Sequence, residues 1–277
     1  MEREAFQIVD SSVLSIPDWK EHHPQLIIGF TTRNGGVSQD SFQSLNLGLH
    51  VPDDSKAVIK NRKIVGDKIK TNLSNWVCAD QVHDKKIVKV TQHHKGAGVF
   101  SYDECISGTD GLYTFEKNVL LALFFADCVP IFFFSPKNSL IGICHAGWRG
   151  TAKNIAGEFV DHWAKEEGIV AEEIYAAIGP SIRDCCYVVN DDVLEGLNEV
   201  YPLNKSGRLV RQVETGQYAV NLAELNRELL ILKGVPDEQI VVSSYCTSCH
   251  ENLFFSHRRD KGKTGRMMGF IGMKEGM

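Results

Sequence analysis

Two short apolar runs, residues 119–128 and 131–136, dominate the hydrophobic pattern of the chain. Short runs of bulky apolar residues are typical of strands that are buried on both faces. Further strand-like segments occur at residues 26–33, 76–84, 86–92, 139–147, 172–182, 239–246 and 266–273. The chain therefore contains many short strands distributed over its whole length.

Helical patterns alternate with these strands. Residues 53–70 begin with acidic residues, place apolar residues at helical spacing and end with basic residues, which predicts an amphipathic helix. Residues 148–168 predict a second helix, with Thr151 near its N-cap and Gly168 at its end. Residues 190–200 and 221–234 predict two more. Because no repeat or linker interrupts the pattern, we expect a single α/β domain over residues 1–277, with a mixed β-sheet and helices packed on its faces.

Composition narrows the possible classes of function. The chain has 277 residues, 43% of them hydrophobic, and a formal net charge of −5. The acidic balance argues against nucleic acid or an anionic membrane as the main partner. Asp127 interrupts the longest apolar run, and the first residues, MEREAFQIVDSS, lack the pattern of a signal peptide. We expect a cytoplasmic protein that spans no membrane and, without a long exposed apolar helix, a monomer.

Eight cysteines suggest chemistry rather than disulfides in a chain of this kind. His83, Cys128 and His145 fall on or beside predicted strands. Two imidazoles and one thiolate suit Zn²⁺, and three protein ligands leave a fourth tetrahedral position for water or substrate. The three residues are far apart in sequence, so spacing alone leaves open that Cys128 is a small buried hydrophobe and His145 a structural residue.

Two glycine-bearing turns carry polar residues. HAGWRGT, residues 145–151, places Arg149 where a strand leads into a helix, an arrangement that suits a bound phosphate but also occurs in ordinary strand-to-helix turns. SGTDGLYT, residues 107–114, places Asp110 between two glycines, and the default interpretation is a plain turn with an Asx hydrogen bond.

CTSCH, residues 246–250, matches the attachment motif of c-type haem. We expect no haem because the chain shows no export signal, and no thioredoxin-like redox site because the context differs. A zinc ribbon needs a second cysteine pair, and only the adjacent Cys185 and Cys186 could supply it. FFSHRRDKGKTGR, residues 254–266, is either a loop that contacts a ligand or a solvated charged loop.

Several stretches together resemble one known family. They are TTRNGGVSQDSFQSLNLGLHV, QVH, GTDGLYT, ADCVPIFF, HAGWRGT, IGPSI, and CT followed by FFSHRRD and TGR. In this order, from Ile28 to Ile271, they resemble the bacterial laccase-domain proteins of the YfiH/YlmD type. That family was formerly described as multicopper polyphenol oxidases and is now described as zinc-dependent purine nucleoside phosphorylases with adenosine deaminase activity. One departure is His257, which stands where a tyrosine is common.

The resemblance implies an α/β fold and a metal on His83, Cys128 and His145. It also implies an enzyme that converts adenosine, inosine, guanosine or S-methyl-5′-thioadenosine with phosphate to the base and the ribose 1-phosphate. The sequence does not rank these nucleosides. One site with two histidines does not make a multicopper oxidase, so we expect copper only as an adventitious occupant.

For such a reaction we expect Arg149 to position phosphate, with Arg33 adding charge. Asn46 and Gln81 would contact the ribose or the purine. Asp127 is assigned to the substrate-binding set, where it could orient a ligand histidine. Together with the metal trio, these residues form the predicted site.

Two other functions remain open from the sequence. Cys128 could be the nucleophile of a cysteine hydrolase with His145 as its base, acting on an amide such as a wrongly assembled peptidoglycan precursor. The chain could also be a non-enzymatic interaction module that zinc stabilises.

Overall fold

The computed structural model describes residues 4–204 and 207–275 and confirms the α/β class with mixed sheets. The described strands form three sheets, where the sequence predicted one. The first sheet has the order β1 (Gln7–Asp10), β2 (Val13–Ser15), β3 (Leu26–Thr31), β15 (Met267–Met273), β7 (Leu120–Phe125) and β4 (Trp76–Cys78). The second has the order β14 (Ile240–Val242), β10 (Tyr175–Ile178), β8 (Val129–Ser135), β9 (Leu140–Ala146), β6 (Gly111–Thr114) and β5 (Ile87–Lys89). The third has the order β11 (Val188–Val189), β13 (Gln217–Val220) and β12 (Val210–Glu214).

The apolar runs at β7 and β8 explain why the two large sheets stack. In β8, Ile131 and Phe133 belong to one core cluster and Phe132 and Phe134 to another, because successive side chains of a strand point to opposite faces. The cluster that contains Phe132 and Phe134 also contains residues of β3, β7 and β15 from the other sheet. The two sheets therefore share a core, and each strand run is apolar on both sides.

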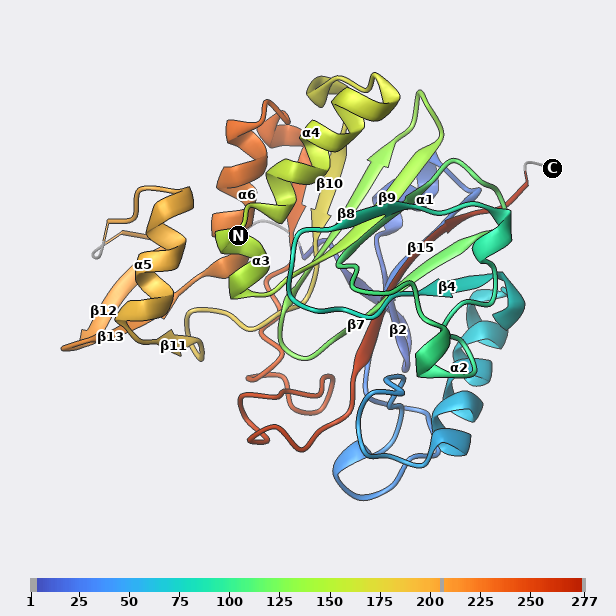
Figure 1. The fold of residues 1–277 in the computed structure, drawn as a ribbon. Helices are drawn as coiled ribbons and strands as arrows, with labels where there is room; N and C mark the ends of the chain where they lie inside the picture. Colours follow the sequence, from blue (N-terminus) through green and yellow to red (C-terminus); the bar gives the residue numbers. More distant parts are fainter. Residues whose placement is uncertain (1–3, 205–206, 276–277) are drawn as a thin grey trace.

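Helices cover the outer faces (Figure 1). The described helices are α1 (Pro17–His22), α2 (Ser55–Ile69), α3 (Trp148–Ala152), α4 (Ile155–Glu167), α5 (Asp191–Val200) and α6 (Leu222–Leu232). Phe159 and Trp163 of α4 pack against Phe133 of β8, and the ring of Phe133 stacks on Phe159 at 4.1 Å. On the opposite side, Val65 of α2 shares a core with the outer face of the first sheet. The order of layers is helix, sheet, sheet, helix, and none of the described helices has the length and apolar character that crossing a membrane requires.

The helix predicted over residues 148–168 is interrupted. It divides into α3 and α4 at Asn154, which adopts a left-handed φ of 57° and caps α4 by accepting a hydrogen bond from Gly157. Thr151, predicted to lie near the N-cap, lies inside α3, where its buried hydroxyl accepts a hydrogen bond from Asn226. Asparagine tolerates the left-handed conformation and is a strong N-cap, so it starts the longer helix. The predicted end at Gly168 is confirmed.

Strand register brings the predicted ligands together. In the antiparallel pair of β8 and β9, Pro130 lies opposite His145, which places Cys128 two residues beyond this pair. The segment from β7 to β8 turns through residues 126–128, at the same end of the sheets. The site is therefore formed where strands of the two sheets end.

Candidate active site

His83, Cys128 and His145 converge. One ligand atom from each lies within 4.8 Å of the others. The distance from Cys128 Sγ to His83 Nε2 is 3.9 Å, and the two imidazole rings meet edge to face at 4.8 Å. His83 is exposed, Cys128 half-buried and His145 buried, so one side of the group faces outward. Gly147 permits this approach, because a Cβ at that position would lie 2.9 Å from the Cys128 sulfur.

Asp110 holds two of the three residues in place. Its fully buried carboxylate accepts hydrogen bonds from the backbone N–H groups of Val82, His83 and Asp84 at 2.9–3.1 Å. It also accepts one from His145 Nδ1 at 2.8 Å. The predicted strand over residues 76–84 therefore ends at Cys78, and His83 takes a left-handed φ of 61° in a loop wrapped around a carboxylate. Asp110 therefore supports His83 and His145 of the trio, and the interpretation as a plain turn was wrong.

The hydrogen bond to Asp110 also fixes the tautomer of His145 when its imidazole is neutral. Since Nδ1 donates its proton to the carboxylate, the lone pair of Nε2 is left to face the other ligands. Burial raises the pKa of Asp110, but the hydrogen bonds from His145 and the backbone outweigh it, so the net direction is downward. The carboxylate thus stays ionised.

The surroundings of Cys128 favour its thiolate form. Burial raises its pKa, but the neighbouring charges and hydrogen bonds of His145 and His83 outweigh burial, so that its pKa falls to about 6. Burial lowers the pKa of His145, while Cys128 and Asp110 raise it, and the net direction is upward. A thiolate between two imidazoles is a donor set that binds soft or borderline divalent metals. The residues therefore fit a metal ion with three protein ligands and an open side.

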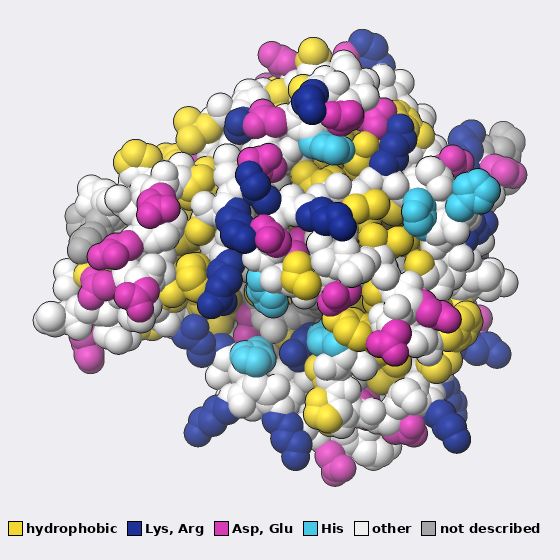
Figure 2. All heavy atoms as spheres, in the orientation of Figure 1, with side chains coloured by type: hydrophobic (Ala, Val, Ile, Leu, Met, Phe, Trp, Pro, Cys, Tyr) yellow, Lys and Arg dark blue, Asp and Glu magenta, His cyan; other side chains and the backbone are white. Residues whose placement is uncertain are grey.

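The open side faces a cavity of about 390 Å³, within the range of small-molecule sites. Figure 2 shows a hollow in the middle of this face, with histidine, lysine and arginine side chains around it. Besides the His–Cys–His trio, Gln81, Asp127 and Arg149, the cavity is lined by His50, Ala79, Tyr102, Phe124, Ala126, Trp148, Ile182, Tyr187, Leu222, His257, Arg258 and Arg266. Aromatic rings and arginines thus share one cavity with the trio.

Three of the predicted substrate-binding or phosphate-positioning residues line this cavity. Arg149 is exposed, and its guanidinium lies 4.4 Å from the ring of Trp148. The side-chain amide of Gln81 is hydrogen-bonded to the backbone of Phe124. It donates to the carbonyl oxygen and accepts from the N–H. Arg149 is therefore free to meet an anion, whereas the amide of Gln81 supports the wall.

Asp127 also lines the cavity, but the described hydrogen bonds of its carboxylate join it to Thr247, Ser256 and Arg258 and not to a histidine. It accepts from the hydroxyls of Thr247 at 2.6 Å and Ser256 at 3.0 Å, and from the backbone N–H of Arg258 at 2.9 Å. These contacts fix the loop that carries Arg258, instead of orienting a ligand histidine as the sequence analysis expected.

Arg33 and Asn46 lie outside the set that lines the cavity. Arg33 donates to the carbonyl oxygens of Gln43 and Glu251, and its guanidinium lies 4.6 Å from the ring of Phe255. Asn46 is fully buried and accepts from the backbone N–H of Arg266 at 2.9 Å. The structure makes both residues supports of the scaffold and does not bring them to the cavity.

The chain resembles a known family over most of its length. The family model described as multi-copper polyphenol oxidoreductase laccase matches residues 27–274. The chain belongs to this family. A relative from Bacillus subtilis, purine nucleoside phosphorylase YlmD, is 50% identical over 98% of both chains.

Solved structures from the family have the same fold. The hypothetical protein YfiH from Bacillus licheniformis superposes with a TM-score of 0.94 at 50% identity, covering 98% of this chain and all of that one. YlmD from Geobacillus stearothermophilus also gives 0.94, at 46% identity, covering 99% of this chain and all of that one. The resemblance recognised in the motifs is confirmed.

The cavity is also lined by two arginines that were not predicted as site residues from the sequence. Arg258 and Arg266 add two further guanidinium groups to Arg149. Arg258 donates to the carbonyl oxygen of Val188 and lies 4.9 Å from the ring of Tyr187. The loop of residues 254–266 therefore contributes His257, Arg258 and Arg266 to the cavity wall, and contact with a ligand stays a prediction. The sequence signal that could have identified Arg258 and Arg266 was their position within the family motifs.

The described metal-binding groups contain too few histidines for the multicopper chemistry that the family name implies. Within residues 4–204 and 207–275, two groups of side chains could hold a metal, and only the trio contains histidine. The other comprises four cysteines. No described cluster thus supplies the many histidines of a multicopper centre.

Proposed function

We propose that this chain is a zinc-dependent purine nucleoside phosphorylase that also deaminates adenosine. The observation that carries the proposal is the cavity itself, which joins an outward-facing His–Cys–His trio to three arginines and several aromatic rings. The relatives named as purine nucleoside phosphorylases support the same reaction. The substrates are a purine nucleoside and phosphate, and the products are the base and the ribose 1-phosphate.

The cavity offers separate surfaces for the two substrates. Arg149 would hold phosphate by charge and paired N–H donors, which match its oxygens. Arg258 and Arg266, whose Nη1 groups already donate to backbone carbonyl oxygens, would add positive charge. The rings of Phe124 and Tyr187 offer flat apolar surfaces for a purine. Asp127, which already accepts three hydrogen bonds, keeps the Arg258 loop in place and so fixes one side of the phosphate position.

In phosphorolysis, a phosphate oxygen attacks C1′ of the ribose as the C1′–N9 bond breaks, and the electron pair of that bond leaves with the purine. The arginines stabilise the anion and align it with C1′, which replaces an encounter in solution by a fixed geometry. Zinc, held by His83, Cys128 and His145, would supply a Lewis acid at the open side of the trio. Deamination replaces the amino group at C6 of adenosine by water and releases ammonia, and the same cavity would hold the purine for both reactions.

The test is incubation of purified protein with adenosine, with and without phosphate, followed by chromatography. Adenine should form only with phosphate, whereas inosine should form in both samples. Zinc and copper should be measured in the same preparation, with zinc expected. His83→Ala, Cys128→Ala and His145→Ala should abolish both activities and lower the metal content, while the surface control His93→Ala should change neither. Phosphorolysis that persists in metal-free protein would contradict the role of zinc.

One observation favours a second candidate, a cysteine hydrolase. The lowered pKa of Cys128 beside His145 is the arrangement of a thiolate nucleophile and its base. This function predicts turnover of amide or thioester substrates by metal-free protein and no consumption of phosphate. Metal analysis combined with thiol alkylation separates the two candidates.

A further inference from the structure

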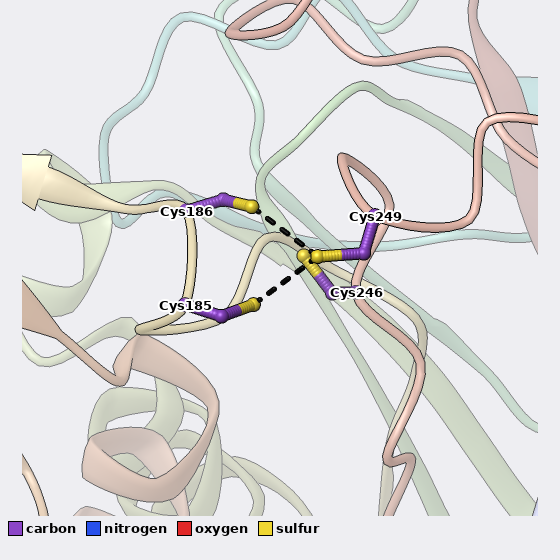
Figure 3. Close-up of side chains that lie close together, drawn as sticks. All are labelled: Cys185, Cys186, Cys246 and Cys249. Carbon is purple, nitrogen blue, oxygen red and sulfur yellow. Dashed lines mark hydrogen bonds between the residues drawn. The ribbon is translucent and has the colours of Figure 1, made fainter.

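Four cysteines gather at a second place, away from the trio. Cys185 and Cys186 lie in the turn between β10 and β11, and Cys246 and Cys249 follow β14. All four sulfurs lie within 4.8 Å of one another. Cys249 Sγ is 3.4 Å from Cys185 Sγ and 3.3 Å from Cys186 Sγ (Figure 3). The second pair that CTSCH needs is therefore supplied by the fold.

The local backbone explains how adjacent cysteines serve one point. Neighbouring side chains of an extended strand point to opposite faces. Here the backbone N–H groups of Cys186 and Tyr187 both donate to the carbonyl oxygen of Arg183, at 2.9 and 2.8 Å, so the chain curls. Figure 3 shows the side chains of Cys185 and Cys186 both directed toward Cys249. The turn thus presents two sulfurs on the same side.

The segment that carries Cys246 and Cys249 is also held by backbone hydrogen bonds. The N–H of His250 donates to the carbonyl oxygen of Cys246 at 3.0 Å, which closes the CTSCH turn. Ser181 and Cys246 form a parallel bridge, and the N–H of Thr247 donates to Ser181 at 3.0 Å. Arg183 reaches across to the carbonyl oxygen of Ser243. The two cysteine pairs are held face to face by protein contacts alone.

Sulfur spacing agrees with a four-thiolate metal site. A tetrahedral zinc with Zn–S bonds of about 2.3 Å separates its sulfurs by about 3.8 Å. The two sulfur contacts at 3.3 and 3.4 Å and the outer limit of 4.8 Å bracket this value. All four residues are free thiols in the structure. We propose that Cys185, Cys186, Cys246 and Cys249 bind one zinc ion as a closed structural site.

This site, the cysteine clasp, would stabilise one wall of the active-site cavity. Tyr187 follows Cys186 directly and lines the cavity beneath Arg258. Thr247 follows Cys246 directly and donates to Asp127. A metal ion in the clasp would link the two segments that carry Tyr187 and Thr247. It would thereby stabilise the described shape of the cavity. Unlike the trio, four protein sulfurs leave no open position, and the clasp carries no reaction.

The test measures metal and thiols and is independent of catalysis. Zinc per chain should be determined in the purified full-length protein, together with free thiols counted in denaturant without reductant. Two zinc ions and all eight thiols are expected. Cys185→Ser combined with Cys249→Ser should remove one zinc and leave the other, whereas the control Cys105→Ser should keep both. His83→Ala should weaken only the trio and leave the clasp zinc.

A spectroscopic measurement covers the case in which the cysteine variant fails to fold. X-ray absorption at the zinc edge of the wild-type protein should show five sulfur ligands shared by two zinc ions, against one sulfur for one zinc if only the trio binds. The proposal is overturned by zinc that shows only the sulfur of the trio, by unchanged zinc content in the folded double variant, or by a thiol count that reveals disulfides among these four cysteines.

Discussion

Asp110→Asn is the most direct probe of how the trio is held. The carboxylate receives four hydrogen bonds, two on each oxygen. Oδ1 accepts from the backbone of His83 and from His145, and Oδ2 accepts from the backbone of Val82 and Asp84. Asparagine has nearly the same size but only one acceptor oxygen, so half of these bonds cannot form. Both orientations of the new amide are unfavourable.

If the amide nitrogen takes the place of Oδ2, two backbone N–H groups lose their acceptor. If it takes the place of Oδ1, the N–H of His83 loses its acceptor and His145 must accept through Nδ1, which moves its proton to Nε2. That tautomer cannot ligate a metal. An orphaned buried donor costs about 1–3 kcal/mol, so we expect a loss of unfolding free energy of about 2–6 kcal/mol in the first orientation and of about 1–3 kcal/mol in the second. Loss of a carboxylate partner of a metal-binding histidine weakens metal affinity about 10- to 100-fold.

The assay is competition between protein and a chromophoric chelator for zinc, with urea unfolding of the metal-free protein in parallel. Using the Cys185→Ser, Cys249→Ser background leaves the trio as the site under test. Asp103→Asn, an exposed aspartate in the same segment, is the matched control and should change neither quantity. A folded Asp110→Asn protein with zinc affinity within twofold of its background would refute the proposed support of His145.

Three further results follow from the structure. Asn46→Ala should lower the unfolding free energy by about 2 kcal/mol or more in urea titrations, because it removes a buried acceptor from two backbone N–H groups; an increase in nucleoside KM without loss of stability would contradict this scaffold role. Arg149→Ala should raise the KM for phosphate about tenfold with little effect on the KM for nucleoside, whereas Arg33→Ala should leave the phosphate KM unchanged; equal effects on both substrates would argue against a phosphate site at Arg149. In metal-free protein, iodoacetamide should alkylate Cys128 with a rate that rises through about pH 6 instead of pH 9, since its folded pKa is lowered and the thiolate reacts; zinc should protect it, and equal reactivity with and without zinc would exclude the sulfur as a ligand.

The sequence predicted the elements whose signal is local. The apolar runs over residues 119–136 correspond to β7 and β8, and the amphipathic pattern over residues 53–70 to α2. Both are consequences of side-chain periodicity, which a single segment carries by itself. The short strands β6 and β11 were not predicted, because their two to four residues gain their pairing only from distant neighbours.

The identities of the trio were also available from the sequence, because few residue types ligate metals and the family motifs mark three of them. The residue that supports the trio could not be identified from the sequence. Asp110 resembles a turn residue until the loop carrying His83 is wrapped around it. Arg33 and Asn46 have side chains suited to ligands, yet the fold places them against its own backbone.

The four cysteines show the same division most clearly. Their number and positions are properties of the sequence, in which only the adjacent Cys185 and Cys186 could supply a second pair beside Cys246 and Cys249. Only the tertiary structure decided that a curled turn and a distant loop meet. Local patterns determine which segments form helices and strands, but which polar or sulfur atoms become neighbours depends on packing between segments that are far apart in the chain.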